Sequence, residues 1–237
     1  MFWKKMSYPA VTFATTVWEK DWRQILLDPE YLPVRQIGNH LFPFAERLLI
    51  INNVEDAEGA RRAAEKWVEK GVLSRVVTAE KGTLGFFGLE GLSGWFYYNA
   101  IGPLTAIREC ATPFLVYLTG DVRLDGPLDW IRPSLLKMEQ NRNFKVANPV
   151  WNGRYDEAKR EAKGKSGPFY VGREGFSDQM FLVRTDDFRQ PIYNETRGDA
   201  GHFPHGDTFE KRVFSYMKNR GWERIIFRRG SYTHENF

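Results

Sequence analysis

The feature that most constrains the fold of this chain is the alternation of apolar strand segments with a helical segment in its first half. Residues 11–18 (VTFATTVW), 47–53 (RLLIINN) and 74–79 (SRVVTA) are rich in β-branched residues, which predicts three strands. Between the second and the third, a helix is predicted to begin at Asp56 and to end at Gly71. Strands that alternate with helices form a parallel sheet with helices on its faces. The sequence therefore predicts an α/β fold.

The second half continues the mixed pattern without an internal repeat or a recognisable linker. One domain is therefore the simplest interpretation of the 237 residues. Further strands are predicted at 114–118, 145–151, 179–184 and 224–228, and further helices at 19–27, 95–110, 128–141 and 207–219.

Two stretches are predicted to be flexible loops. The first runs from Gly82 to Gly94 and has a glycine at every third position, but it contains no proline and is too short for a collagen triple helix. The second spans 154–168, where a charged surface helix is followed by Gly-Lys-Ser-Gly-Pro. Because loops often carry function, both are candidates for a lid over a binding site.

Composition excludes several classes of protein. Hydrophobic residues make up 42% of the chain and charged residues 27%, which is typical of a globular protein with a core. The net charge of +4 does not demand a polyanionic partner, and no nucleic-acid-binding module is recognisable. The single cysteine, Cys110, rules out an intrachain disulfide. No apolar run is long enough to span a membrane and no signal peptide is recognisable, which predicts a cytoplasmic protein.

Two further features of the composition each allow two interpretations. Aromatic residues make up 15% of the chain and include eight tryptophans, for which core packing is favoured over sugar stacking. Between Lys211 and Gly230, seven basic residues stand against one acidic residue. Such a segment is either a solvated face or a local phosphate site.

Polar residues at the strand ends are the candidate site residues, because ligands of open α/β sheets bind at the carboxyl ends of the strands. Asp121 is the most informative, since it follows an apolar strand and Gly120, which permits close approach by another backbone or a ligand. Its carboxylate could hold a divalent cation or cap the following turn, and Asp125 could share that cation or face solvent. The strand-end candidates are Thr15, Thr16, Asn52, Asn53, Glu80 and Asp121.

Motifs of several common classes are absent. There is no G-x-G-x-x-G dinucleotide motif and no G-x-S-x-G hydrolase motif. The triplet 164–166 (GKS) lacks the earlier glycine of a phosphate-binding loop, because position 159 is lysine. His202 and His205 are three residues apart but have no clear third partner for zinc.

Five segments in this order resemble the GT-A fold of nucleotide-sugar glycosyltransferases, close to family 2, over about residues 11–237. The resemblance implies a single domain over 1–237 with a mostly parallel central sheet flanked by helices. It implies a nucleotide-binding half over about 1–110 and a metal and acceptor half over about 111–237. The segments are VTFATTVW (11–18), RLLIINNVED (47–56), FLVYLTGDVRL (114–124), QMFLVRTDDF (179–188) and GDTFEKRVFSYM (206–217).

The implied activity is transfer of a sugar from a nucleotide diphosphate sugar to a hydroxyl of a glycan or other acceptor, with inversion. The resemblance implies a divalent cation, Mn²⁺ or Mg²⁺, held by Asp121 of a D-x-D motif and by His234. In this sequence Arg123 stands where the second aspartate would be, so arginines could instead neutralise the diphosphate. The implied donor-binding residues are Thr15, Thr16, Asn52 and Asn53.

The implied catalytic base is an acidic residue at the start of a late helix, which corresponds to Asp207, with Glu210 one turn further on. The alternative is that Asp207 is the N-cap of the helix and Glu210 a first-turn acid, and of the two Asp207 is favoured as the base. Asp178, in the segment Gly-Phe-Ser-Asp-Gln, resembles an acceptor-binding aspartate. The alternative to an enzyme is a non-catalytic nucleotide- or carbohydrate-binding protein on the same fold.

Overall fold

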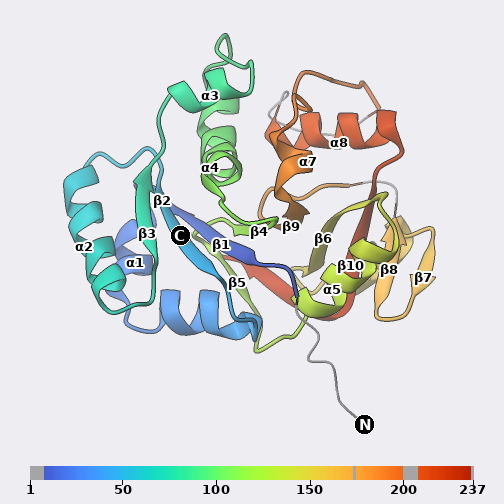
Figure 1. Ribbon diagram of the computed structural model, residues 1–237, viewed down its shortest axis with the longest axis horizontal. Helices are drawn as coiled ribbons and strands as arrows, with labels where there is room; N and C mark the ends of the chain where they lie inside the picture. Colours follow the sequence, from blue (N-terminus) through green and yellow to red (C-terminus); the bar gives the residue numbers. More distant parts are fainter. Residues whose placement is uncertain (1–7, 173–174, 200–207, 236–237) are drawn as a thin grey trace.

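The computed structural model describes residues 8–172, 175–199 and 208–235, and its strands form one continuous sheet (Figure 1). The strands are β1 (Val11–Val17), β2 (Glu46–Ile51), β3 (Arg75–Thr78), β4 (Phe114–Leu118), β5 (Val122–Leu124), β6 (Phe144–Trp151), β7 (Gly164–Ser166), β8 (Phe169–Gly172), β9 (Met180–Arg184) and β10 (Glu223–His234).

The sheet has the strand order β3-β2-β1-β4-β9-β6-β10-β8-β7, and β5 pairs with β10 outside this path. Its N-terminal half, β3-β2-β1-β4, is entirely parallel. The C-terminal half is mixed, because β9 runs antiparallel to both β4 and β6, while β6 and β10 are parallel. The predicted α/β class, with a central sheet flanked by helices, is confirmed.

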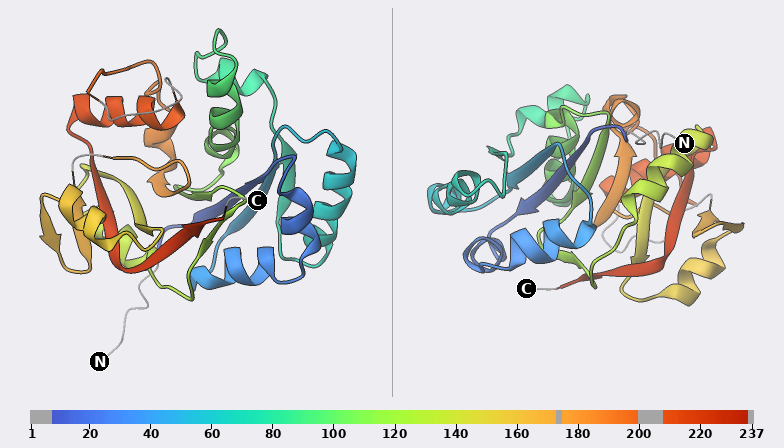
Figure 2. Two further views of the ribbon diagram at one scale, coloured as in Figure 1. Left: turned by 180° about the vertical axis from the view of Figure 1, so that it is seen from behind. Right: turned by 60° about the horizontal axis from the view of Figure 1, so that its bottom comes forward.

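Helices cover both faces of the sheet. Alternate residues of β2 pack in different cores. Leu48 and Ile50 pack with α4, whereas Leu49 and Ile51 pack with α1 and α2, so α4 lies on the opposite face of the sheet from α1 and α2. Figure 2 shows the same arrangement from behind and from below. The helices are α1 (Trp22–Leu27), α2 (Ala57–Glu69), α3 (Gly82–Phe86), α4 (Trp95–Glu109), α5 (Ile131–Gln140), α6 (Tyr155–Glu161), α7 (Thr185–Arg189) and α8 (Phe209–Arg220), with a π-helical turn at Tyr31–Ile37 and a 3-10 turn at Gly38–His40.

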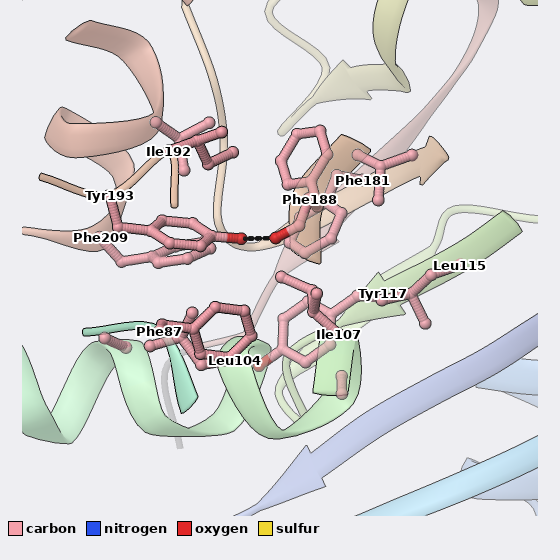
Figure 3. Close-up of a cluster of buried hydrophobic side chains, with 14 of the residues drawn as sticks. Phe87, Leu104, Ile107, Leu115, Tyr117, Phe181, Phe188, Ile192, Tyr193 and Phe209 are labelled. Carbon is pink, nitrogen blue, oxygen red and sulfur yellow. Dashed lines mark hydrogen bonds between the residues drawn. The ribbon is translucent and has the colours of Figure 1, made fainter. Parts of the chain in front are cut away.

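A buried aromatic cluster joins α4 to α7 and α8 (Figure 3). Tyr193 and Phe209 stack with ring centroids 5.5 Å apart, and the Tyr193 hydroxyl donates to the carbonyl of Phe188 at 2.5 Å. Phe181 of β9 stacks on Tyr117 of β4 at 5.0 Å. Aromatic pairs of this kind add to the area they bury, so the cluster fixes α4 against β4, α7 and α8.

The two stretches predicted as flexible loops are partly regular in structure. Residues 82–94 begin with α3, and Leu84, Phe87 and Leu89 are buried in the core. Their burial outweighs the flexibility that the regularly spaced glycines suggested. The charged surface helix predicted in 154–168 is present as α6. The loop predicted after it is wrong, because Gly164–Ser166 form β7, which pairs antiparallel with β8 as a hairpin.

The last strand is longer than predicted. β10 continues to His234, and its end pairs antiparallel with β5, so that His234 lies opposite Val122. His234 therefore belongs to the sheet rather than to a tail. None of the described helices has both the length and the apolar character that a bilayer span requires.

Candidate functional site

A cavity of about 550 Å³, here called the strand-end cavity, opens at the carboxyl ends of β1, β2 and β4. This is the edge of the sheet at which ligands of open α/β folds bind, and the volume is in the usual range for a small-molecule site. The N-terminal half of the chain contributes Thr16, Trp18 and Asn52 to the lining, and α4 forms a side wall.

Gly120 brings β4 close to the end of β1. A Cβ at this position would lie 2.3 Å from the carbonyl oxygen of Thr16 and 2.5 Å from Cδ1 of Ile25. The side-chain amide of Gln36 holds the same turn, donating to the carbonyl of Gly120 at 2.7 Å. The backbone approach that the sequence suggested for this glycine is present, and it sets the position of Asp121 in the cavity.

Asp121 and His234 meet at the floor of the strand-end cavity, although 113 positions separate them in the chain. Oδ2 of Asp121 lies 2.8 Å from Nε2 of His234. The hydroxyl of Thr119 donates to Oδ1 of Asp121 at 2.8 Å, and Gln179 contacts Nδ1 of His234 at 3.0 Å. The hydrogen bond to Asp121 raises the pKa of His234 above its ordinary value.

Two more carboxylates line the strand-end cavity. Burial raises the pKa of Asp21 to about 8, and the nearby charge of Asp121 adds to the effect. Burial also raises the pKa of Asp178 to about 6, although His234 acts against the increase. Among the described residues of the lining there are three aspartates and no lysine or arginine. An anionic ligand in this cavity therefore needs a positive charge that the described lysines and arginines of the lining do not supply.

The residues present fit a divalent cation. Asp121 and His234 offer an oxygen and a nitrogen 2.8 Å apart, and neighbouring ligands on one ion with bonds of ~2.1 Å are about 3 Å apart. Manganese accepts carboxylate and imidazole ligands. Within the described part of the chain no group of three or more His, Cys, Asp or Glu side chains could hold a metal. A cation here would therefore find no third ligand among the described His, Cys, Asp and Glu side chains.

Two charged residues near Asp121 are engaged elsewhere. Asp125 accepts hydrogen bonds from the hydroxyls of Ser231 and Thr233, so its carboxylate is held against β10. Arg123 forms a salt bridge with Glu235 at 2.6 Å and does not line the strand-end cavity. Neither the shared cation suggested for Asp125 nor diphosphate neutralisation by Arg123 is supported by these positions.

Three of the four residues predicted to bind the donor lie in the strand-end cavity. Thr16, Asn52 and Asn53 line it, and the two asparagine side chains are joined by a 2.6 Å hydrogen bond. Thr15 is fully buried and is not part of the lining. Successive side chains of a strand point to opposite faces, so Thr15 and Thr16 cannot serve the same cavity.

Three aromatic residues of the strand-end cavity were not predicted as site residues. Trp18, Trp95 and Tyr98 are 41%, 50% and 58% exposed, and all three line the cavity. Trp95 and Tyr98 are three residues apart on α4 and therefore share one helix face. Their spacing, ahead of the long apolar stretch of the same helix, is the signal that could have identified them. Exposed aromatic faces at a cavity suit stacking on a planar base or a sugar ring.

A second cavity of about 380 Å³, here called the side cavity, shares Asp178 and Gln179 with the strand-end cavity. The α8 residue Glu210 lines only the side cavity. Burial raises the pKa of Glu210 well above its ordinary value; the charge of Asp178 adds to the increase, whereas Arg224 acts against it. The two cavities therefore meet at a carboxyl group, Asp178, with a second acid on the far side.

The start of α8 differs from the prediction. Thr208 is the N-cap, because its hydroxyl oxygen accepts a hydrogen bond from the backbone N–H of Lys211 at 3.1 Å. Asp207, the predicted catalytic base or cap, lies outside the described residues.

The basic segment after Lys211 does not form one phosphate site in the part that the structure describes. Its residues are divided between α8 and β10, and Arg224 is buried against Glu161 at 2.7 Å. Gly175, with a φ of +88°, packs on the Arg224 guanidinium, where a Cβ would lie 2.4 Å from a terminal nitrogen. Arg224 thus forms part of the wall of the side cavity.

Comparisons with known proteins identify the fold. No family model matches the chain, and no curated protein matches it in sequence. The solved structures that resemble it include GalNAc-T7 with UDP, GalNAc and Mn²⁺, at a TM-score of 0.59 and 12% identity over 97% of this chain. The mannosyltransferase PcManGT from Pyrobaculum calidifontis, with GDP-Man and Mn²⁺, has a TM-score of 0.57 and 15% identity over 96% of this chain.

The chain therefore has the GT-A fold of glycosyltransferases. At identities of 12% and 15% the likeness is one of fold, and it points to no particular family, family 2 included. The chain spans 44% and 57% of the length of these two proteins.

Proposed function

We propose that this chain is a glycosyltransferase that moves a sugar from a nucleotide diphosphate sugar to a hydroxyl acceptor in the synthesis of a glycan or polysaccharide. The observation that carries the proposal is the meeting of two cavities at Asp178, with the Asp121–His234 pair on the floor of the first. Group transfer needs two substrates side by side, and it needs stabilisation of the negative charge that develops on the leaving group. This arrangement offers both.

We assign the donor to the strand-end cavity. Its nucleoside would lie along the N-terminal half of the chain, by Thr16, Asn52 and Asn53, with aromatic faces from Trp18 and Trp95 beside it. Its diphosphate would lie by Asp121 and His234. Both solved structures named above contain a nucleotide and Mn²⁺.

We further propose that Asp121 and His234 hold a divalent cation, Mn²⁺ or Mg²⁺. The Asp121 carboxylate and the absence of lysine and arginine among the described lining residues support it. When bound, the cation supplies positive charge for the leaving diphosphate. Thr119 keeps Asp121 in place through its hydroxyl, and Asp121 in turn orients the imidazole of His234.

We assign the acceptor to the side cavity. Its hydroxyl oxygen would attack the anomeric carbon as the bond from that carbon to the diphosphate breaks, which gives inversion. The hydroxyl proton would pass to a carboxylate at the junction of the cavities. Asp178 and Glu210 are the described candidates, and Asp207 is the candidate that the sequence adds. Among the described pair, Asp178 is the acid that lines both cavities.

The proposal is tested by assaying transfer and donor hydrolysis with uridine, guanosine and thymidine diphosphate sugars in Mn²⁺. Turnover with one nucleotide, together with saturable binding of the corresponding diphosphate, is the expected result. Tight binding without turnover would favour the non-catalytic binding protein, which the arginine at the second D-x-D position also suggests. Neither binding nor turnover with any donor would refute the proposal.

A further inference from the structure

A group of lysines and arginines lies where α6 meets the hairpin of β7 and β8, at one edge of the sheet (Figure 1). Lys165 of β7 lies opposite Tyr170 of β8, and its Nζ is 5.8 Å from the centre of the Tyr170 ring. Nε of Arg228 donates to the carbonyl of Gly167, in the turn of the hairpin, at 3.3 Å. This surface is here called the basic face, and its cationic residues are Lys159, Arg160, Lys163, Lys165, Arg228 and Arg229.

The helix α6 packs on the same side of the sheet as Lys165. Ala158 of α6 is buried in one small core with Tyr170 of β8 and Ile226 of β10. Residues directly opposite each other on paired strands share a face of the sheet, so Lys165 stands on the face that α6 covers. The cations of the helix and those of the hairpin therefore belong to one surface.

The helix α6 also borders the side cavity. Glu157 and Glu161, one turn apart, both line this cavity. Lys159 and Arg160 lie between them in the chain, are exposed and do not line the cavity. The side cavity, to which we assign the acceptor, and the basic face are therefore neighbouring surfaces of one helix.

The acids of α6 do not neutralise the basic face. Glu161 and Glu157 each bind an arginine that lines the side cavity, at 2.7 Å and 3.2 Å. Lys163 forms a salt bridge with Glu223 at 3.9 Å. The other five cations of the basic face form no ion pair with any residue that the structure describes.

Protection of the sheet edge explains only part of this charge. Lysines on short edge strands prevent pairing with another chain, and Lys165 on β7 fits that role. Lys159 and Arg160 lie on a helix, however, and Arg228 and Arg229 lie on β10, which has neighbours on both sides. Like charges on one surface repel one another, and a bound polyanion removes that cost.

We propose that the basic face binds an anionic glycan, which is the acceptor: its accepting end lies in the side cavity and its negative groups lie along α6 and the hairpin. The inference rests on the proposed function, because it takes the side cavity as the acceptor site. It names the chemical class of the acceptor as a sugar chain that carries carboxylate, phosphate or sulfate groups.

A glycan fits this surface better than a bilayer or a nucleic acid. Stable attachment to a bilayer takes buried apolar groups as well as cations, and single-stranded nucleic acid is bound by stacking on aromatic faces. Among the described residues of 154–172 and 223–229, Tyr155, at 40% exposure, is the one large apolar side chain that is this exposed. A flexible anionic glycan needs only cations along its path, and its end can enter the neighbouring cavity.

Two double variants remove charge from different elements of the basic face. Lys165→Gln with Arg229→Gln acts at the hairpin and at β10, and leaves Arg228 to hold the hairpin turn. Lys159→Gln with Arg160→Gln acts on α6 and decides the question alone if the hairpin variant does not fold. Melting temperatures check the fold of each.

The matched control is Arg62→Gln with Lys66→Gln. Both residues are exposed on α2, so the control loses the same net charge as each test variant. The helix α2 lies at the opposite end of the molecule from β7 (Figure 1). Any effect of net charge alone should therefore appear equally in the control.

The first measurement is binding of a labelled oligogalacturonate by fluorescence anisotropy at low salt. A maltooligosaccharide of the same length is the neutral probe. The wild type should bind the acidic probe at least about 10-fold more tightly than the neutral one, and added salt should reduce the difference. Each double variant should bind the acidic probe at least about fivefold more weakly than the wild type, as expected for two lost exposed charge contacts, and the control should stay within about twofold.

The second measurement is hydrogen exchange with the acidic probe at saturation. A glycan that spans both surfaces should protect α6, β7 and residues 175–179, which line the side cavity. Protection of α6 and β7 without protection of 175–179 would show that the glycan does not enter the cavity, and its role as acceptor would be wrong.

The outcomes separate this inference from the proposed function. Equal binding of the acidic and the neutral probe, or wild-type affinity in both double variants, would overturn the inference whatever the donor assays show. Single-stranded DNA or phosphatidylglycerol vesicles that bind more tightly than the acidic probe, with the same losses in the variants, would assign the basic face to that partner instead. If the acidic probe binds as expected but no nucleotide sugar is bound or turned over, the proposed function is wrong and the basic face remains a glycan-binding surface.

Discussion

Asp121→Asn removes one charge from the strand-end cavity with little change in shape. Asparagine keeps an oxygen that can accept from the Thr119 hydroxyl, which lies 2.8 Å from Oδ1 in the wild type. The contact with His234 at 2.8 Å loses its charge assistance. We expect the free energy of unfolding to fall by only about 1 kcal/mol, the difference between hydrogen bonds to charged and to neutral groups. For a chain of this size that lowers the melting temperature by about 2–4 °C.

Ligand binding should change far more than stability. No lysine or arginine is among the described lining residues, so in the proposed function the diphosphate depends on the cation. Asparagine removes the only charged ligand of the proposed pair. We expect a nucleoside diphosphate to bind Asp121→Asn at least about 100-fold more weakly in Mn²⁺, which corresponds to about 2.7 kcal/mol.

Isothermal titration calorimetry with Mn²⁺ and with EDTA measures this loss. In EDTA both proteins should bind the diphosphate weakly and alike, because the cation is absent from both. Wild-type affinity in the variant would show that Asp121 is no ligand. Wild-type binding that is equally tight in EDTA would show that the cavity neutralises the diphosphate by other means.

The same variant tests the electrostatic pairing of Asp121 with His234 in the cation-free protein. The hydrogen bond to Asp121 raises the pKa of His234 in the folded state. Its contribution to stability is then complete below the ordinary pKa of about 6.5 and is lost as the pH rises through the higher folded value. We expect the stability difference between wild type and Asp121→Asn in EDTA to decrease as the pH is raised from 6. A difference that is constant with pH would falsify the pairing.

Three further predictions concern the walls and the junction of the cavities. Trp95→Ala should weaken nucleoside diphosphate binding in calorimetry by about 10-fold or more, because a stacking face is lost. The control is Phe86→Ala, since Phe86 is 55% exposed but lies outside the cavity, and an equal loss in this control would argue against stacking. Asp178→Asn should lower turnover by ~100-fold in steady-state kinetics at nearly constant donor affinity. If only Glu210→Gln shows this loss of turnover, the base lies on α8. Gly120→Ala should cost about 3 kcal/mol in urea unfolding, because its Cβ would lie 2.3 Å from the carbonyl oxygen of Thr16; unchanged stability would mean that the turn relaxes freely.

The sheet could be predicted from the sequence because its strands are short apolar runs with clear ends. The segments around β1, β2 and β4 were predicted within one or two residues of their bounds. The stretch after Gly82 was wrong because glycine spacing was given more weight than Leu84 and Phe87. These side chains are buried against α4 and its neighbours, and tertiary packing of this kind is not a local signal.

The candidate site was predictable only in part, for two physical reasons. Asp121 follows an apolar strand and a glycine, which is a local pattern. Its partner His234 is 113 positions away, and the two meet only through the pairing of β5 with the end of β10. Thr15 does not line the strand-end cavity, because a strand alternates its faces and the sequence alone does not say which face borders the cavity.

Arg123, which stands in place of the second aspartate of a D-x-D motif, has a structural role that follows from the pairing of β5 with β10. Val122 and Leu124 are buried, so the alternation of β5 directs Arg123 away from the core. There its guanidinium binds Glu235 at 2.6 Å, the residue directly after His234, and the backbone N–H of Glu235 donates to the carbonyl of Asp121 at 2.7 Å. The chain is thus fastened on both sides of the Asp121–His234 contact. A residue at this position supports the cavity by fixing the strand that carries the histidine, which an aspartate of the usual motif would not do.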